Sequence, residues 1–318
     1  MKLFDNLPLP FFVLAPMDDV TDTVFRQIVA ECAKPDLFFT EFINVDGLQS
    51  PGRPKLLHKL SFSELEKPIV AQLWGLKPEN FYKTAREVKK MGFDGVDLNM
   101  GCPVKTVIKN GACAALINNR DLTEEIITAV REAVGPNFPV SVKTRVGFTT
   151  VDMSWIEFLL KQKLDLLSIH GRTAKQLSEK PANWELIGQA RQLRDELCPA
   201  TKIVGNGDVS TLAQAKELAD KYKLDGVMIG RGIFHDPFLF AKKSPWDSWP
   251  KQQKLELFIK HIELFRQTYP KGERKFEPLR KFCKVYINGF EGASELRARF
   301  MDTKTPAESL NLIKHQIG

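Results

Sequence analysis

The chain reads Gly95-Val96-Asp97-Leu98-Asn99-Met100-Gly101-Cys102-Pro103 at the point that says most about its fold. Residues 95–98 form a short apolar run, which is typical of a buried parallel strand. Gly101 permits a tight backbone turn, and Pro103 prevents the strand from continuing. Cys102 therefore stands where a strand ends and a loop begins, a position that favours a side chain facing a cleft. Because a cysteine in apolar surroundings is usually a small buried hydrophobe, a structural thiol is the alternative at this point.

Similar runs recur along the first 235 residues and alternate with stretches of helical spacing. The eight runs cover 11–17, 37–42, 68–75, 95–101, 139–147, 166–173, 202–209 and 226–232. Helices are expected over 78–91, 152–163 and 211–222, the last of them after Ser210, a good cap residue. Eight strands that alternate with helices predict an α/β fold, a parallel (β/α)8 TIM barrel. A doubly wound open sheet is the main alternative, but the Gly-x-Gly-x-x-Gly turn that marks it is replaced after the first run by Ala15-Pro16-Met17.

Polar side chains stand at the predicted carboxyl end of each strand, where barrel enzymes collect their chemistry. In chain order they are Asp18 and Asp19, Glu41, Gln72, Asn99 and Cys102, Lys143 and Arg145, His170 and Arg172, Asn206 and Asp208, and Arg231. Each residue alone is weak evidence, but polar groups from every strand that converge on one rim predict an active site.

Two glycine-rich turns follow the last two strands, Gly205-Asn206-Gly207-Asp208 and Gly230-Arg231-Gly232. Barrels usually hold a phosphate at these two loops, because backbone N–H groups approach an anion closely where Cβ is absent. Arg231 can add a bidentate positive charge. Left-handed turns also require glycine, so the motif itself leaves a simple turn as the alternative.

A helical region is expected after the barrel. We place the barrel at 1–241, a linker at 242–250 and a small helical bundle at 251–318. One amphipathic face runs from Leu255 to Tyr269, and a second lies over 276–286 with Arg280, Lys281 and Lys284 turned away from it. Thr305 begins a capping box with proline at the first helical position.

Composition and charge limit the function classes. The 318 residues are 43% hydrophobic, which suffices for a large barrel and a smaller region, and no stretch reaches the ~18 apolar residues of a membrane span. The net charge is +7, and residues 245–318 carry 14 Lys and Arg against 9 Asp and Glu. This excess predicts a polyanion partner, with a merely solvated helix face as the alternative. Five cysteines without a Cys-x-x-Cys pair argue against disulfides and a metal site, and favour a cytoplasmic protein.

The motifs, taken together, resemble those of the tRNA-dihydrouridine synthases, flavin enzymes that reduce uridine in transfer RNA. The resemblance covers nearly the whole chain, and the Asn-x-Gly-Cys-Pro and His-Gly-Arg-Thr blocks are its most specific parts. The matching motifs begin at Leu14, Gln72, Asp97, Val142, Ile169, Gly205 and Ile229. One place is looser, at Gly111-Ala112-Cys113, where Cys113 is expected to be a packing residue among alanines and leucine.

The resemblance implies FMN over the barrel mouth, NADPH as reductant, tRNA as substrate, and a role for each matching residue. The resemblance assigns catalysis to Cys102, as the proton donor. FMN binding falls to Pro16, Met17, Asp18, Gln72, Lys143, His170, Asn206, Gly207, Asp208, Gly230 and Arg231. Substrate binding falls to Asn99, Arg145, Arg172, Arg280, Lys281 and Lys284. The expected protein is a monomer with no obligate protein partner and no membrane association.

The implied reaction explains why a thiol suits this position. Reduction of the uracil C5–C6 bond needs a hydride at C6, the carbon conjugated to the C4 carbonyl, and a proton at C5. An unperturbed thiol has a pKa of about 8.5, so it carries its proton at neutral pH, when a carboxylic acid has already lost its own. The rival interpretations are another FMN barrel that reduces a free pyrimidine, and an RNA-binding barrel without catalysis. No nicotinamide-binding fingerprint is visible.

Overall fold

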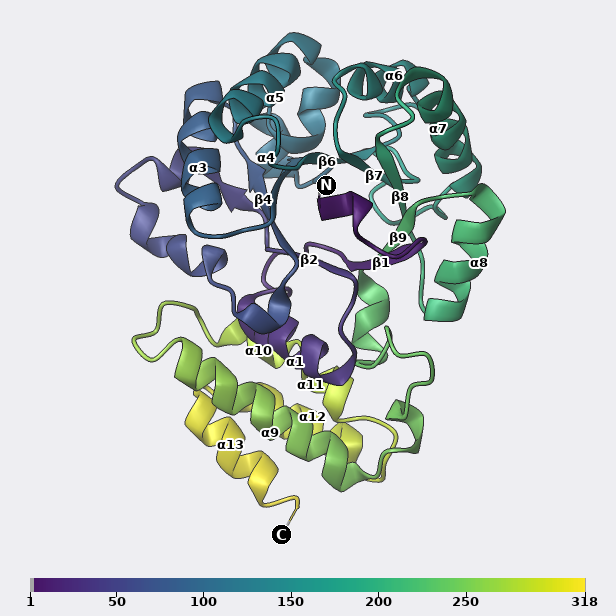
Figure 1. The fold of residues 1–318 in the computed structure, drawn as a ribbon. Coiled ribbons are helices and arrows are strands. Elements are labelled where there is room, and N and C mark those ends of the chain that lie inside the picture. The colour runs from purple at the N-terminus through teal and green to yellow at the C-terminus, as the bar shows by residue number, and fades with distance from the viewer. Residues whose placement is uncertain (1–2, 318) are drawn as a thin grey trace.

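Eight parallel strands close into a barrel in the computed structural model, which describes residues 3–317 (Figure 1). β1 pairs with β9 on one side and with β2 on the other, and β2 pairs with β4, which completes the ring. The two-residue β3 lies beside β4 outside the ring. The strands are β1 (Phe11–Leu14), β2 (Leu37–Phe39), β3 (Ile43–Asn44), β4 (Ile69–Trp74), β5 (Gly95–Met100), β6 (Val140–Arg145), β7 (Leu166–His170), β8 (Lys202–Asn206) and β9 (Gly226–Ile229).

The predicted (β/α)8 barrel is confirmed, and the open-sheet alternative is wrong. Each strand is shorter than its apolar run, because the last residues of each run leave the sheet to form the rim of the barrel. The first run, for example, extends to residue 17, whereas β1 ends at Leu14. Residues 15–17 are therefore free to line a cavity.

Helices cover the outside of the barrel, as Figure 1 shows. They are α1 (Thr23–Ala33), α2 (Val45–Leu48), α3 (Pro78–Lys90), α4 (Lys105–Lys109), α5 (Arg120–Val134), α6 (Met153–Lys161), α7 (Trp184–Leu197) and α8 (Leu212–Tyr222). The three helices expected from periodicity form, with one correction at the start of α8. The cap is Thr211 rather than Ser210, because the Thr211 hydroxyl accepts the backbone N–H of Gln214 at 3.1 Å. Ser210 is thereby left to face the rim.

The barrel interior is built in layers, because alternate side chains of each strand point inward. The lower layer is apolar and includes Val13, Val70, Leu166, Val204 and Met228. A short 3-10 helix, η1 (Leu3–Asp5), contributes the buried Phe4 to this same cluster. The next inward positions are polar, with Gln72 paired in register to Asp97 and Asp97 to Ser141. The upper layer holds Asn99, Lys143, His170 and Asn206, so polarity increases toward the rim.

A helical region lies against one flank of the barrel and contains α9 (Lys251–Thr268), α10 (Glu277–Arg280), α11 (Cys283–Tyr286), α12 (Ala293–Asp302) and α13 (Pro306–Lys314) (Figure 1). The stretch 276–286, expected to form one amphipathic helix, forms two one-turn helices instead. Stretch 242–250 is closely packed: Trp246 is buried, with its ring 5.6 Å from that of Trp249. Within residues 3–317, every helix is too short or too polar to cross a membrane.

Arg274 joins the helical region to the barrel through buried charges. Its Nη1 lies 2.9 Å from Oε2 of Glu41, and its Nε lies 3.1 Å from Oδ2 of Asp22. Glu41 follows β2, and Asp22 caps α1. Burial raises the pKa of Asp22 to about 6, while the charge of Arg274 acts in the opposite direction. Glu41, expected at the active-site rim, therefore serves as an anchor for the helical region.

Candidate active site

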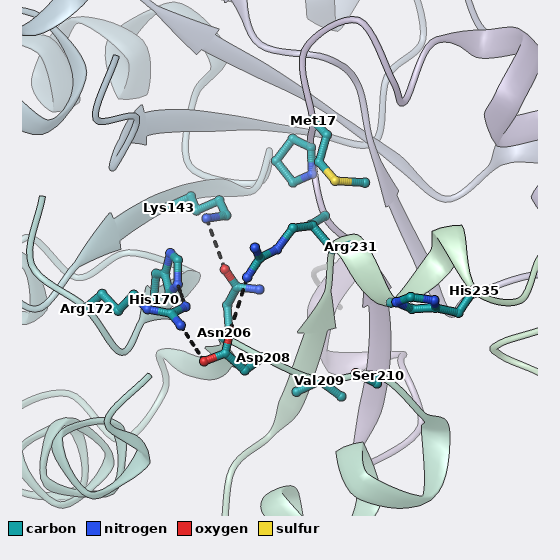
Figure 2. A pocket seen from close by; sticks show the side chains of 15 residues that line it. Met17, Lys143, His170, Arg172, Asn206, Asp208, Val209, Ser210, Arg231 and His235 are labelled. Carbon is teal, nitrogen blue, oxygen red and sulfur yellow. Dashed lines mark hydrogen bonds and ion pairs between the residues drawn. The ribbon is translucent and has the colours of Figure 1, made fainter. Parts of the chain in front are cut away.

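A cavity of about 430 Å³ opens at the carboxyl ends of the strands (Figure 2), which is within the usual size range of ligand sites. Its walls come mainly from the ends of β1, β6, β7, β8 and β9. The lining residues are Ala15, Pro16, Met17, Lys143, His170, Arg172, Asn206, Gly207, Asp208, Val209, Ser210, Gly230, Arg231, Gly232 and His235. Nine of the eleven residues expected to bind a cofactor are among them; Asp18 and Gln72 are not.

Asp208 organises the cationic side of the cavity. Figure 2 shows its carboxylate between Arg172 and Arg231. Arg172 Nη2 donates to Oδ2, and Arg231 Nη2 lies 3.2 Å from Oδ1. Partial burial would raise the pKa of Asp208, but the hydrogen bonds from Arg172 and from the backbone N–H of Ala182 hold it below its ordinary value. Asp208 thus remains ionised and fixes both guanidinium groups at the wall.

The remaining charge of the cavity is positive. Lys143 Nζ lies 3.4 Å from Oδ1 of Asn206, and burial lowers the pKa of Lys143 to about 8. Burial, together with the charges of Lys143 and three arginines, lowers the pKa of His170 far below its usual value. His170 is therefore neutral, and Lys143, Arg172 and Arg231 face a single carboxylate. Such an excess of positive charge favours an anionic ligand.

Glycine occupies positions 207 and 230, in the last two turns, for different structural reasons. Gly207 has a φ of +140°, and a Cβ there would lie 2.4 Å from Cβ of Ala182, so the turn itself requires glycine. Gly230 has a φ of −104°, so a left-handed turn is not the reason at this position. A Cβ at Gly230 would enter the space between Ala15 and Met17, 3.6 Å and 3.7 Å from their nearest atoms. This open wall beside Arg231 fits a phosphate group.

Cys102 lies just after β5, outside the lining of the cavity. Its half-buried thiol is hydrogen-bonded to that of Cys113, and this bond is the main reason why the pKa of Cys102 falls to about 7. Burial opposes this effect, and the charge of Lys143 adds to it. Cys113 is fully buried, as expected of a packing residue, but it also acts on its neighbour. The Cys102 thiol is consequently half ionised near pH 7, more acidic than an unperturbed thiol.

We expect the alkylation rate of Cys102 to rise with pH through a midpoint near 7, because the thiolate is the nucleophile. Cys113→Ala removes the S–H group that stabilises this thiolate and moves the midpoint upward. The measurement is the rate of iodoacetamide labelling at Cys102, located by peptide mass spectrometry, between pH 5.5 and 9.5. Cys198→Ala, at the end of α7, is the matched control. A midpoint that stays in place in Cys113→Ala contradicts the thiol–thiol hydrogen bond.

The other predicted site residues divide into three groups. Gln72 and Asn99 are buried inside the barrel and bonded to each other, with Asn99 Nδ2 donating to Gln72 Oε1 at 3.0 Å. Asp18 turns to Lys59, with which it forms an ion pair. The buried arginines bind backbone carbonyls: Arg145 those of Gly101, Thr173 and Leu177, and Arg172 that of Lys180.

In the helical region the three predicted RNA contacts have different environments. Arg280 is half-buried, and its Nη1 donates to the carbonyl of Met301 at 2.8 Å and to that of Thr303 at 3.4 Å. It therefore binds the end of α12. Lys281 and Lys284 are exposed and remain available to a polyanion.

Five lining residues were not expected from the sequence: Ala15, Val209, Ser210, Gly232 and His235. Four of them adjoin or belong to the motifs that predicted the site, so extending each motif by two residues would have found them. His235 lies at the end of the short 3-10 helix η6 (Arg231–Phe234), and no local pattern marks it. In Figure 2 it lies at the edge of the group of lining side chains, apart from the cluster of Arg172, Asp208 and Arg231.

The fold and the site define an α/β-barrel protein with a cationic cavity at its rim and a thiol of lowered pKa at a neighbouring strand end. The profile of the dihydrouridine synthase (Dus) family matches residues 13–317. The chain belongs to this family.

Individual relatives agree with this membership. The chain is 48% identical over 316 residues to a probable tRNA-dihydrouridine synthase of Staphylococcus aureus (strain COL), covering 98% of this chain and 94% of the relative. It is 45% identical over 306 residues to probable tRNA-dihydrouridine synthase 2 of Bacillus subtilis (strain 168), covering 95% and 93%. Among solved structures, morphinone reductase shares the fold, with a TM-score of 0.54 and 15% identity over 75% of this chain and 86% of that one.

Proposed function

We propose that this protein is a tRNA-dihydrouridine synthase, which reduces the C5–C6 double bond of a specific uridine in tRNA. The observation that carries the proposal is the position of Cys102 at the end of β5, next to the strand that places Lys143 at the wall of a cationic cavity of about 430 Å³. Family membership and the relatives' names support the same activity. We place the enzyme in the cytoplasm, as a monomer.

The cavity is proposed to hold FMN, with NADPH as the external reductant. Arg231, Gly207, Asn206 and Gly230 would bind the phosphate through N–H groups and positive charge. Lys143, His170, Pro16 and Met17 would line the remainder, and Asp208 would keep Arg231 in place. Once NADPH has reduced it, bound FMN would supply the hydride that uracil receives at C6.

Cys102 is proposed to provide the proton for C5 of uracil. Its S–H form is the competent one for this step, and a pKa of about 7 leaves a useful fraction of S–H at neutral pH. Arg145 binds the carbonyl of Gly101 at 2.8 Å, so it would hold the Cys102 loop rather than contact the base through a free guanidinium group. Arg172 and Asn99 would similarly shape the uracil pocket through their neighbours.

The exposed lysines of the helical region are proposed to bind the tRNA backbone. A uridine buried in folded RNA must be extruded to reach the barrel, and backbone contacts offset that cost. Lys284 is exposed on α11, and Lys281 is exposed just before it. Arg280, by contrast, is hydrogen-bonded to the carboxyl end of α12.

We expect Lys281→Gln/Lys284→Gln to weaken tRNA binding and to reduce the slope of log K against log[salt] by about one per lysine. The rate at saturating tRNA should change little, since neither lysine lies near the cavity. Filter binding at several salt concentrations measures both affinity and slope. Lys90→Gln/Lys216→Gln, which removes two exposed lysines from α3 and α8, is the matched control and should leave the slope unchanged. Equal slopes for the two double variants would place the RNA surface elsewhere.

The function itself is tested in cells that lack the protein. We expect tRNA from these cells to lose dihydrouridine at one position, and purified protein to carry flavin absorbance. Mapping by reverse transcription or mass spectrometry identifies the position. Unchanged dihydrouridine content, or reduction of a free pyrimidine with no effect on tRNA, would contradict the proposal.

A further inference from the structure

A buried carboxylate lies inside the barrel, below the cavity. Asp97 is fully buried and accepts two hydrogen bonds, from Ser141 Oγ at 2.6 Å and from Gln72 Nε2 at 2.7 Å. Over residues 3–317 no ion pair is formed by this carboxylate. Burying a charge without a paired cation is costly, and an apolar side chain of similar volume would often be more stable. Stability alone therefore does not account for Asp97.

A chain of hydrogen bonds leads from Asp97 to the loop that carries the thiol. Gln72 receives its second bond at Oε1, from Asn99 Nδ2 at 3.0 Å. Asn99 Oδ1 in turn accepts the backbone N–H of Gly101 at 3.1 Å and that of Cys102 at 2.9 Å. We call Asp97, Gln72 and Asn99 the lumen chain.

The two ends of the lumen chain determine how its two amides are oriented. A carboxylate can only accept hydrogen bonds, and a backbone N–H can only donate. Gln72 must therefore present its NH2 group to Asp97, which leaves its oxygen for Asn99. Asn99 must present NH2 to that oxygen, which leaves its own oxygen for Gly101 and Cys102. Burial raises the pKa of Asp97 to about 6, so the carboxyl group is ionised at pH 7.5 and the polarity holds there.

The Cys102 loop is thus held from both sides. Asn99 binds the N–H groups of Gly101 and Cys102, while Arg145 Nε binds the Gly101 carbonyl at 2.8 Å. Removing the acceptor at Asp97 would let Gln72 and then Asn99 turn over, so that an NH2 group would face two backbone N–H donors. The loop would lose its anchor on one side.

We propose that Asp97 is a positioning residue, whose carboxylate sets the orientation of Gln72 and Asn99 and thereby holds the Cys102 loop in place. That the held thiol delivers a proton to uracil rests on the proposed function. The holding itself is a property of the loop and can be measured without any cofactor or RNA.

The test compares amide hydrogen exchange at Gly101 and Cys102 in four proteins at pH 7.5. Asp97→Leu removes the acceptor with a side chain of similar volume, and we expect exchange at these two amides to accelerate about tenfold or more, the equivalent of one lost hydrogen bond. Asp97→Asn/Gln72→Glu restores the polarity, because the new amide donates to the new carboxylate and that carboxylate accepts from Asn99. Its exchange should return to the wild-type rate. Ser168→Ala, which removes a buried hydroxyl without a partner over residues 3–317, is the control and should not differ from wild type.

Turnover gives the second readout. In Asp97→Leu we expect uridine reduction to slow by about 10²-fold, the usual loss for a misplaced catalytic group, while KM for tRNA stays unchanged. The double variant should regain part of this loss. Thermal melting of each variant shows whether it is folded.

Three outcomes overturn the proposal: wild-type exchange in Asp97→Leu, fast exchange in a folded double variant, or a double variant that does not fold. If Asp97→Leu is too unstable to purify, the double variant alone carries the test, since it must fold and protect both amides. Protection that follows the expected pattern in a protein that reduces no uridine would support the positioning role and contradict the proposed function, so the two failures are distinguishable.

Discussion

Replacing Cys102 with alanine is expected to slow dihydrouridine formation by about 10²–10⁴-fold, the usual effect of a lost general acid. The methyl group has no proton to give to C5 of uracil, whereas the cavity that would hold FMN does not include Cys102 among its lining residues. The variant should therefore keep its flavin and its affinity for tRNA. Single-turnover formation of dihydrouridine measures the rate, and absorbance of the purified variant measures bound flavin.

Cys198→Ala is the matched control for this experiment. Cys198 is a half-buried thiol at the carboxyl end of α7, and it is not among the residues that line the cavity. Its removal should leave the rate of reduction unchanged. Full activity in Cys102→Ala would assign the proton donor to another group, and loss of flavin from that variant would show that Cys102 acts through cofactor binding instead.

Replacing Arg274 with methionine is expected to destabilise the protein by about 3–5 kcal/mol, the usual consequence of removing one partner from a buried ion pair. Arg274 is 5% exposed, and its guanidinium group lies 3.1 Å from Asp22 and 2.9 Å from Glu41. Without it, Asp22 would lose its ion pair at 3.1 Å, and Glu41 would be left with the more distant Lys59, at 3.9 Å. Urea denaturation followed by circular dichroism gives the free energy of unfolding.

Two further variants separate charge from packing at this position. Lys275→Met removes a neighbouring exposed cation and should change the unfolding free energy by less than about 0.5 kcal/mol. Arg274→Met/Glu41→Gln removes one of the two stranded carboxylates and should regain part of the lost stability. If Arg274→Met is as stable as the wild type, the buried charges do not hold the helical region to the barrel.

The barrel could be predicted from the sequence because its signal is local and repeated. Each strand of the ring lies within a short apolar run, and most of the runs are followed by an amphipathic stretch. The signal for one wall of the cavity was equally local, since Gly207 and Arg231 both line it and both lie in turns that directly follow strands. Helix starts were less certain: Ser210 and Thr211 are both good cap residues, and only the bond from Gln214 to the Thr211 hydroxyl distinguishes them.

The roles of the polar rim residues were less predictable. Glu41, Arg145 and Arg172 all stand at strand ends, yet each binds atoms of the protein itself. Their partners are distant in the chain: Glu41 and Arg274 are separated by 233 residues, and Arg145 and Gly101 by 44. No spacing rule connects such pairs. Cys113 likewise looked like a packing residue, because its hydrogen bond to Cys102 depends on how the loop folds back.

The fold, the strand ends that form the rim and the thiol at one of them could all be predicted from the amino-acid sequence. Hydrophobic periodicity and strand boundaries depend on residues that are close together in the chain. The tertiary structure alone decided which polar groups face the cavity and which satisfy one another. The parallel pairing of β4 with β5 brings Gln72, Asp97 and Asn99 together, and a buried hydrogen-bonding group must take whatever partner the folded barrel supplies. The lowered pKa of Cys102 follows from its neighbour Cys113, and the position of its loop follows from the hydrogen bonds to Asn99 and Arg145.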